Sequence, residues 1–389
     1  MKTHRITRLS SLAILASVLA TVGCDNRDLP TAGEFSDEAL TVEAPAFPNG
    51  EALKVLTRNM YLGGSVGLVL GADFSDEASV VAAATALWGQ VQATNFSERA
   101  EALAAEIDEA RPHVVGIQEI PQYAVLDGSY SPIEVQDHLG ILMEELQGLP
   151  YELATVQTNT VVMLPVLFQT GVRLVQYVDR IAVLVRTDLD VTGVASANYE
   201  AAKVINPMIS ILRGWIRVSA DVGGVPYHFV NTHLEIQAFA DTQSDQADEL
   251  LNDVMNDLDG VTILLGDLNS DAEGGPGDPS WTPTYGTLLD AGFQDTWELD
   301  HPGVPFDGLT CCQADLVNND IPTLYSRVDF ILIRATDHQG SSNRLPGSIH
   351  IDMVGEEQAD RTEASGLWPS DHTGLLGSFK VPSSLFRGF

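Results

Sequence analysis

The chain is poor in basic residues. Its 389 residues include 20 Lys and Arg against 54 Asp and Glu, which gives a formal net charge of −34. Lysines and arginines displace the counterions of a nucleic-acid backbone, so this balance disfavours unaided nucleic-acid binding, and no strong basic patch stands out. A local basic or metal-filled cleft is still allowed. The excess of acid otherwise indicates a solubilising surface, of the kind suited to a salty habitat.

Cysteine is also scarce, and the three that occur are Cys24, Cys311 and Cys312. The chain is too long for a small module held together by disulfides. The adjacent pair in GLTCCQADL either forms a vicinal disulfide or stays reduced. A zinc site there is disfavoured, because tetrahedral zinc needs ligands spread around the ion. We interpret the pair as structural.

A third feature that the sequence lacks is an apolar run long enough to span a membrane. At the N-terminus, basic residues precede the short stretch LAILASVLATVG, as in a secretory signal. Small residues then precede Cys24, which resembles a bacterial lipoprotein signal, in which this cysteine becomes the acylated first residue. Ordinary signal cleavage is the alternative, because Thr21 stands where such signals prefer leucine. We predict a signal peptide over 1–23 and an exported protein of the bacterial cell envelope, anchored to a membrane through lipid on Cys24 or secreted.

The rest of the chain divides into a tether and one domain. Residues 24–50 are rich in Asp, Glu, Pro and Gly without a period, which indicates a flexible tether. Residues 51–385 alternate strand and helix patterns, and predict one α/β domain that we expect to be a monomer. Strands are predicted at 53–59, 114–117, 172–186, 211–220, 225–232, 261–266, 328–333 and 373–379, and helices at 76–90, 97–110, 133–147 and 243–258.

Two long apolar stretches, 155–178 and 196–213, interrupt this alternation. We expect both to be buried core. The alternative is an apolar lip beside a functional site, which would suit a lipid or a substrate held in a membrane.

Polar residues that can carry chemistry stand at the ends of the apolar strands. Ligands gather outside one set of strand ends in α/β sheets, and an unpaired buried charge is costly, so we expect one site there. Each residue alone has a structural explanation: a turn for Asn59, a core histidine for His233, an Asx-turn for Asp267 and Asn269, and loop starts or caps for the others. The full set is Asn59, Glu119, His233, Asp267, Asn269, Asp329, Asp371 and His372.

Together these residues form motifs that resemble, in order, those of the endonuclease/exonuclease/phosphatase (deoxyribonuclease-I-like) superfamily. The motifs are QE (118–119), NTHLE (231–235), GDLN (266–269), RVDFIL (327–332) and SDH (370–372), and the resemblance covers about residues 53–380. It implies a four-layer α/β/β/α sandwich, with two mixed β-sheets packed face to face and helices outside. It also implies hydrolysis of phosphoester bonds with a divalent metal, usually Mg²⁺.

The resemblance implies a metal site and a water-activating group. Glu119 matches the principal metal carboxylate, with Asn59 and Asp371 close by, and such hard oxygen ligands suit Mg²⁺ or Mn²⁺. Asp267 matches the residue that orients or deprotonates the attacking water, and Asn269 matches one that holds a phosphate oxygen.

It further implies a pair of histidines at the phosphate. His233 and His372 match this pair and are expected to be imidazolium groups that stabilise the developing charge. Asp329 matches the acid that fixes the tautomer of His372 and keeps it cationic. Asp179 and Arg180 stand where family members often carry a further polar pair, with a structural salt bridge as the alternative.

These residues predict a metal-dependent phosphoester hydrolase that attacks a phosphodiester or phosphomonoester with an activated water. The scarcity of bases favours a lipid or small-molecule substrate. So does the likeness of NTHLEIQAFADTQSDQADEL to sphingomyelinase-like and inositol-phosphatase-like branches of the family. An extracellular nuclease acting on DNA or RNA is one alternative. A non-catalytic cell-surface binding protein on the same fold is another, disfavoured because every matched position keeps a competent residue.

Overall fold

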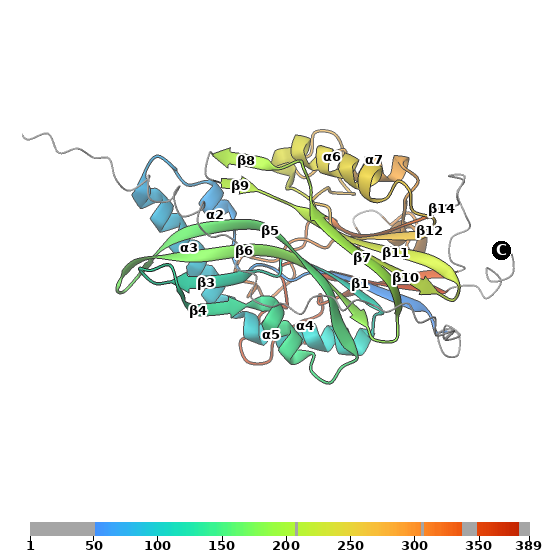
Figure 1. The fold of residues 1–389 in the computed structure, drawn as a ribbon, viewed down its shortest axis with the longest axis horizontal. Helices are drawn as coiled ribbons and strands as arrows, with labels where there is room; N and C mark the ends of the chain where they lie inside the picture. Colours follow the sequence, from blue (N-terminus) through green and yellow to red (C-terminus); the bar gives the residue numbers. More distant parts are fainter. Residues whose placement is uncertain (1–50, 207–208, 305–306, 337–347, 381–389) are drawn as a thin grey trace, which may run out of the picture.

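The computed structural model describes residues 51–206, 209–304, 307–336 and 348–380 (Figure 1). The predicted signal peptide, the tether with Cys24, and the last residues of the predicted domain, 381–385, lie outside the described residues. Within the described ranges, no helix combines the length and the apolar composition that crossing a membrane requires.

The larger sheet has eight strands and is mixed. Its order is β15–β16–β1–β2–β6–β3–β4, and β5 also pairs with β6. β1 and β2 run parallel, whereas β1–β16 and β2–β6 are antiparallel. The bounds are β1 (Leu53–Asn59), β2 (Val114–Gln118), β3 (Gln122–Leu126), β4 (Pro132–Asp137), β5 (Tyr151–Phe168), β6 (Gly171–Arg186), β15 (Ser348–Val354) and β16 (Gly374–Lys380).

The second sheet has six strands in the order β13–β14–β12–β11–β10–β7. β11 and β12 run parallel and their other neighbours are antiparallel. A separate two-stranded sheet pairs β8 with β9. The bounds are β7 (Asp190–Asn198), β8 (Lys203–Asn206), β9 (Ile209–Ile211), β10 (Gly214–Val222), β11 (Val225–His233), β12 (Gly260–Asp267), β13 (Gln294–Asp295) and β14 (Asp329–Thr336).

The two sheets and their helices form four layers, which confirms the predicted sandwich (Figure 1). Apolar side chains of both sheets meet in one core, among them Val183 and Phe229. A second cluster packs α4 (Phe96–Ala110) and α5 (His138–Glu145) on the outer face of the eight-stranded sheet. A third packs α6 (Ala240–Glu249), the π-helical turn Leu250–Val254 and α7 (Thr284–Asp290) on the six-stranded sheet. The remaining α-helices of the described residues are α2 (Gly67–Leu70), α3 (Glu77–Ala93) and α8 (Thr296–Asp300), and two short 3-10 helices span Gln237–Phe239 and Gln358–Asp360.

Most predicted elements are confirmed, and one is wrong. The helix predicted over 133–147 is the edge strand β4 followed by α5. Ile133 and Val135 are exposed on β4, so the apolar residues there follow the two-residue period of a strand. The stretch 155–178 is largely a long hairpin of β5 and β6 in the main sheet, and the expectation that it is buried core is wrong, because most of its residues are exposed or partly buried. The same expectation is wrong for the described part of 196–213, where Tyr199 alone is buried.

Sheet topology brings the functional residues to one edge. β1 and β2 are parallel and end at Asn59 and Gln118, and β11 and β12 are parallel and end at His233 and Asp267. β14 runs antiparallel to β12, so it begins at this same edge, with Asp329 opposite Asp267. His372 precedes β16, which is antiparallel to β1. The carboxyl ends of the parallel strands and the first residues of their antiparallel neighbours therefore lie at the same edge.

Candidate active site

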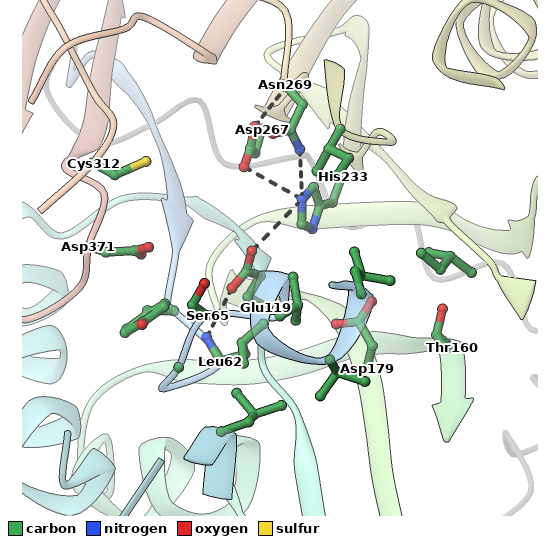
Figure 2. A pocket seen from close by; sticks show the side chains of 18 of the residues that line it. Leu62, Ser65, Glu119, Thr160, Asp179, His233, Asp267, Asn269, Cys312 and Asp371 are labelled. Atoms are coloured by element: carbon green, nitrogen blue, oxygen red, sulfur yellow. Dashed lines mark hydrogen bonds and ion pairs between the residues drawn. The ribbon is translucent and has the colours of Figure 1, made fainter. Parts of the chain in front are cut away.

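Six of the eight predicted site residues line a single cavity of about 490 Å³ (Figure 2). They are Glu119, His233, Asp267, Asn269, Asp371 and His372. The other two, Asn59 and Asp329, lie behind the wall, and each forms a hydrogen bond with a residue that lines the cavity.

Asp267 is held in place by two hydrogen bonds at the end of β12. Its Oδ1 accepts from the backbone nitrogen of Asn269 at 2.8 Å, and its Oδ2 accepts from Nδ2 of Asn59 at 3.1 Å. The first bond closes a tight turn in which Asn269 adopts a φ of 50°, so the expected Asx-turn is present within the site itself. Burial, together with the carboxylate of Asp329, raises the pKa of Asp267 to about 7. A carboxylate so placed can accept a proton near neutral pH.

His372 is the cationic histidine of the site. Its Nδ1 donates to Oδ2 of Asp329 at 2.7 Å, which leaves Nε2 toward the cavity. Burial alone would lower the pKa of His372, but the carboxylates of Asp329 and Asp371 raise it well above its usual value. Asp329 thus holds the ring in one tautomer and favours the imidazolium form, as the resemblance implied.

The expectation that His233 is also an imidazolium is wrong. Burial, the guanidinium of Arg213 and the charge of His372 lower the pKa of His233 well below its usual value. Nη1 of Arg213, which can only donate, lies 2.9 Å from Nδ1 of His233 and 3.2 Å from Nε2. Nε2 also lies 3.1 Å from Nδ2 of Asn269 and 3.5 Å from Oδ2 of Asp267. The second positive charge of the site belongs to Arg213.

Glu119 stands just beyond β2 in a left-handed conformation, with a φ of 51°. Such a backbone is uncommon for a residue with a side chain and is found at functional sites. Oε2 accepts from the backbone nitrogen of Leu62 at 3.0 Å, and Oε1 lies 3.9 Å from Nε2 of His233 (Figure 2). The possible ligand atoms of Glu119, His233 and Asp267 all lie within 4.8 Å of one another.

The donor set fits a divalent cation. Burial, opposed by the charge of His372 and supported by that of Glu119, raises the pKa of Asp371 to about 7, so negative charge is concentrated in a poorly solvated place that a cation would neutralise. Glu119 and Asp371 would supply the hard oxygen ligands that Mg²⁺ prefers. The amide oxygen of Asn59 accepts from the backbone nitrogen of Tyr61 at 2.9 Å and its nitrogen donates to Asp267, so here Asn59 positions Asp267. Its role as a metal ligand stays a prediction.

Asp179 and Arg180 do not bond to each other within the structure. Arg180 turns away from the cavity and donates to Ile120 O and Pro121 O, both at 3.0 Å, and to Asp137. Asp179 is buried, lines the cavity and accepts from Nδ2 of Asn159 at 3.3 Å. Burial raises its pKa to about 6, against the opposing effect of Arg213. Arg180 therefore has a structural role, and Asp179 alone is part of the site.

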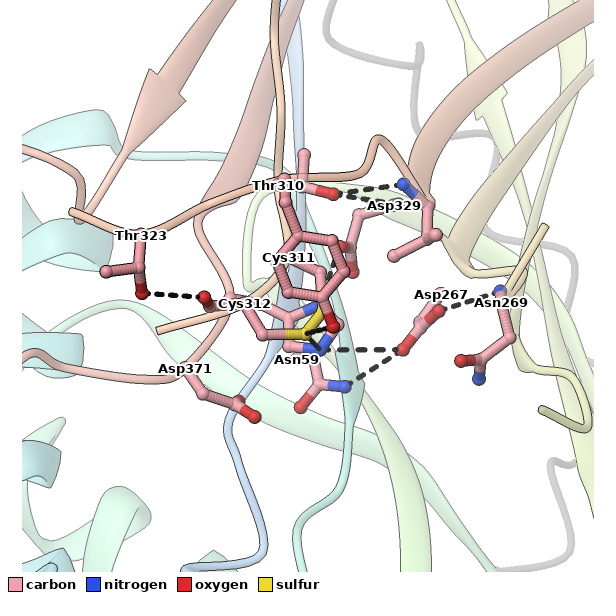
Figure 3. The surroundings of a disulfide bond; sticks show 12 residues. Asn59, Asp267, Asn269, Thr310, Cys311, Cys312, Thr323, Asp329 and Asp371 are labelled. Atoms are coloured by element: carbon pink, nitrogen blue, oxygen red, sulfur yellow. Dashed lines mark hydrogen bonds and ion pairs between the residues drawn. A yellow bond between two sulfur atoms is a disulfide. The ribbon is translucent and has the colours of Figure 1, made fainter. Parts of the chain in front are cut away.

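The vicinal cysteines form a disulfide that is part of the cavity wall (Figure 3). Sγ of Cys312 lies 4.0 Å from Nε2 of His372, and Cys311 makes isolated β-bridges to Ser326 and His372. The pair thus has the predicted structural role, and it also borders His372.

Two residues that support the site were not predicted. Arg213 contacts His233 and donates to Glu235 at 3.3 Å. The predicted hairpin of β10 and β11 could have indicated this contact, because its register places Gly214, the next residue, opposite His233. Gln243 on α6 donates to Glu235 O at 2.6 Å and to Asn269 O at 2.9 Å. It therefore joins the two loops that follow β11 and β12.

The sequence model of the Endonuclease/Exonuclease/phosphatase family matches residues 86–372, and the chain belongs to this family. Members of the family are generally phosphoester hydrolases. A search of the curated proteins found no match to this chain.

Solved structures with the same fold include two from bacteria. An endonuclease/exonuclease/phosphatase family protein from Leptotrichia buccalis is 18% identical, and the alignment covers 84% of this chain and 99% of that one with a TM-score of 0.52. An endonuclease/exonuclease/phosphatase from Beutenbergia cavernae is 17% identical, with 86% and 72% covered and a TM-score of 0.52. At these identities the likeness concerns the fold alone.

Proposed function

We propose that this chain is a divalent-metal-dependent phosphoester hydrolase, exported and held at the cell envelope by a lipid on Cys24. One observation carries the catalytic part. A buried carboxylate with a pKa near 7, a neutral histidine and an imidazolium, from Asp267, His233 and His372, face the same cavity. Attack of water on a phosphoester needs a base or orienting group, donors for the phosphoryl oxygens and help for the leaving group, and these residues supply each.

Glu119 and Asp371 would hold the metal, with Mg²⁺ as the first choice and Mn²⁺ as the second. When bound there, the ion would polarise the phosphoryl group and neutralise charge that develops on its oxygens. Glu119 is already fixed for this by its hydrogen bond from Leu62, and its side chain is 16% exposed.

The remaining residues have separate roles in the proposed reaction. Asp267, fixed by Asn59 and Asn269, orients the attacking water and accepts its proton. The ring of His233 and the side-chain amide of Asn269, whose Nε2 and Nδ2 lie 3.1 Å apart, contact the phosphoryl oxygens. Nε2–H of His372 stabilises the negative charge that develops during attack. Asp329 accepts from Nδ1 of the same ring and so keeps the ring protonated.

The charges of the cavity favour a lipid or small-molecule phosphoester over a nucleic acid. Among the described residues that line it, Arg213 is the only lysine or arginine, whereas six are Asp or Glu. Binding a polynucleotide requires several cations along its backbone. This wall can accept one phosphate beside a bound metal, but it would repel the neighbouring phosphates of a strand.

A substrate panel tests the proposal. The mature chain is incubated with Mg²⁺ or Mn²⁺ and bis(p-nitrophenyl) phosphate, sphingomyelin, inositol phosphates or plasmid DNA. Metal-dependent cleavage of a small or lipid phosphoester is expected. Cleavage of none of them would favour a binding protein on this fold, and plasmid as the best substrate by a wide margin would favour a nuclease. Anchoring is tested separately: Cys24→Ser should release the protein from membranes, and retention of that variant would count against the lipid.

A further inference from the structure

The cavity has two ends of different chemistry. Beyond Glu119 and His233, away from Asp371, lies a part that we call the apolar arm. Figure 2 shows Thr160 and Asp179 on this side. The arm receives side chains from the loop after β1, from α2, from β5 and from β9. Its walls include six aliphatic side chains: Leu62, Val69, Leu70, Val162, Leu164 and Ile211.

The apolar arm is the open side of a hydrophobic cluster. Leu62 and Leu164 are buried members of a cluster that also joins α3 to β5 and β6. Val69, Val162 and Tyr177 pack against this cluster while remaining partly exposed. Water in contact with such a wall is unfavourable, and covering it with an apolar group releases that free energy. A ligand with an apolar part would therefore be stabilised here.

The polar groups of the arm already have partners in the protein. Oγ1 of Thr160 donates to Leu212 O at 3.0 Å and accepts from Leu212 N at 2.8 Å. Asp179 accepts from Asn159, and the hydroxyl of Tyr123 donates to Leu62 O at 3.0 Å. Groups that are paired internally do not need hydrogen bonds from a ligand. An aliphatic group can fill the arm without leaving these donors and acceptors unpaired.

The arm suits an aliphatic chain better than a nucleobase. Bases bind by stacking on exposed rings and by hydrogen bonds to their edges. Tyr61 and Tyr123, which line the cavity, are only 4% and 1% exposed, so they present little ring surface. Phe74 and Tyr177 are partly exposed. Tyr325 is 65% exposed, but its hydroxyl contacts Sγ of Cys312 at the other end of the cavity. The walls formed by α2 and β5 are branched aliphatic side chains, which contact methylene groups on all sides.

We infer that the substrate is a phosphoester with an aliphatic chain, alkyl or prenyl, and that this chain occupies the apolar arm. The inference rests on the proposed function, because it takes the phosphate to lie between Glu119 and His372. Each further methylene that enters the arm should tighten binding about fourfold.

Alkylphosphonates test this directly, because their P–C bond is not hydrolysed and binding is measured whether or not turnover occurs. Binding of methyl-, butyl- and octylphosphonate to the mature chain with Mg²⁺ is followed by isothermal titration calorimetry. From butyl to octyl, the Kd should fall about 200-fold. Leu70→Asn should reduce this ratio about tenfold or more, because a polar side chain then faces the methylenes. Leu68→Asn is the matched control: Leu68 is also on α2 and partly exposed, but does not line the cavity.

A Kd that does not change with chain length would overturn the inference, and so would equal effects of the Leu68 and Leu70 substitutions. Tighter binding of thymidine 5′-monophosphate than of octylphosphonate would also overturn it. Failure of the proposed function looks different: no substrate in the panel is cleaved, while the dependence of the Kd on chain length persists.

Discussion

Substitution of Asp329 by Asn tests the role of the imidazolium of His372. The amide keeps the shape of the carboxylate and its oxygen can still accept from Nδ1, so the ring stays in place while the negative charge is lost. The 2.7 Å hydrogen bond to a buried carboxylate is charge-assisted, and such bonds contribute about 1.5–3 kcal/mol. At about 1.4 kcal/mol per unit, the pKa of His372 should fall by about one to two units.

The direction of the effect on activity follows from this pKa. Asp329 raises the pKa of His372, so its removal lets the ring lose its proton at lower pH. The alkaline limb of the kcat/KM profile should move to lower pH. Above the wild-type pKa of His372 the loss should reach about 10- to 100-fold, and near pH 6 it should be smaller. Rates are measured with bis(p-nitrophenyl) phosphate between pH 5 and 10, together with the ¹⁵N shifts of the histidine rings.

Asp295→Asn is the control, because Asp295 is a buried carboxylate of the same sheet that does not line the cavity. It accepts from Arg327 at 2.5 Å and from the hydroxyl of Tyr285 at 2.9 Å. This variant should lower the free energy of unfolding by about 3–5 kcal/mol without moving the pH profile. An unchanged alkaline limb in the Asp329 variant, or a loss that is uniform in pH, would refute the role of the imidazolium.

Two further substitutions test the frame of the site. Arg213→Gln should lower the free energy of unfolding by about 3–5 kcal/mol, because Glu235 then stays buried without the guanidinium that pairs with it. Urea unfolding measures this loss, and Arg213→Lys, which keeps the positive charge, should lower the free energy of unfolding less. Gly266→Ala should cost about 1–3 kcal/mol of backbone strain, because Gly266 has a φ of 146°. It should also cause a steric clash, because a Cβ there would lie 2.0 Å from Thr232 O. Gly193→Ala on β7, where a Cβ would contact nothing within 4 Å, should be near neutral, and equal unfolding midpoints for the two alanine variants would contradict this reading of the backbone.

Much of the fold was predictable because its strands are buried on both faces and are therefore continuous apolar runs. β12 is such a strand: Ile263 and Leu265 face the other sheet, and Leu264 faces α6. Where that condition fails, the sequence misleads. β4 is an edge strand with exposed apolar residues, and five of its six residues, 133–137, fall within the predicted helix. The helix predicted over 243–258 ends its regular part at Glu249 and continues as a π-helical turn, which depends on tertiary packing.

The site was predictable where its polar residues lie at the ends of predicted strands. Asp267 and His233 stand at the ends of predicted strands, so their proximity needs only the topology of the sheets. The charge state of His233 was not predictable, because it depends on the distance to Arg213, which belongs to a different strand. The position of Cys312 beside His372 depends on the path of a loop, for which the sequence has no periodic pattern.

The most direct test of the account is metal-dependent release of p-nitrophenolate from bis(p-nitrophenyl) phosphate by the mature chain and by Glu119→Gln. Glu134→Gln is the control, because Glu134 is exposed on β4, away from the cavity. The account predicts hydrolysis that requires Mg²⁺ or Mn²⁺, is removed by a chelator, and falls at least about 100-fold in the Glu119 variant but not in the control. Hydrolysis that is undiminished by Glu119→Gln, or absent from the wild-type chain with every divalent metal, would contradict it.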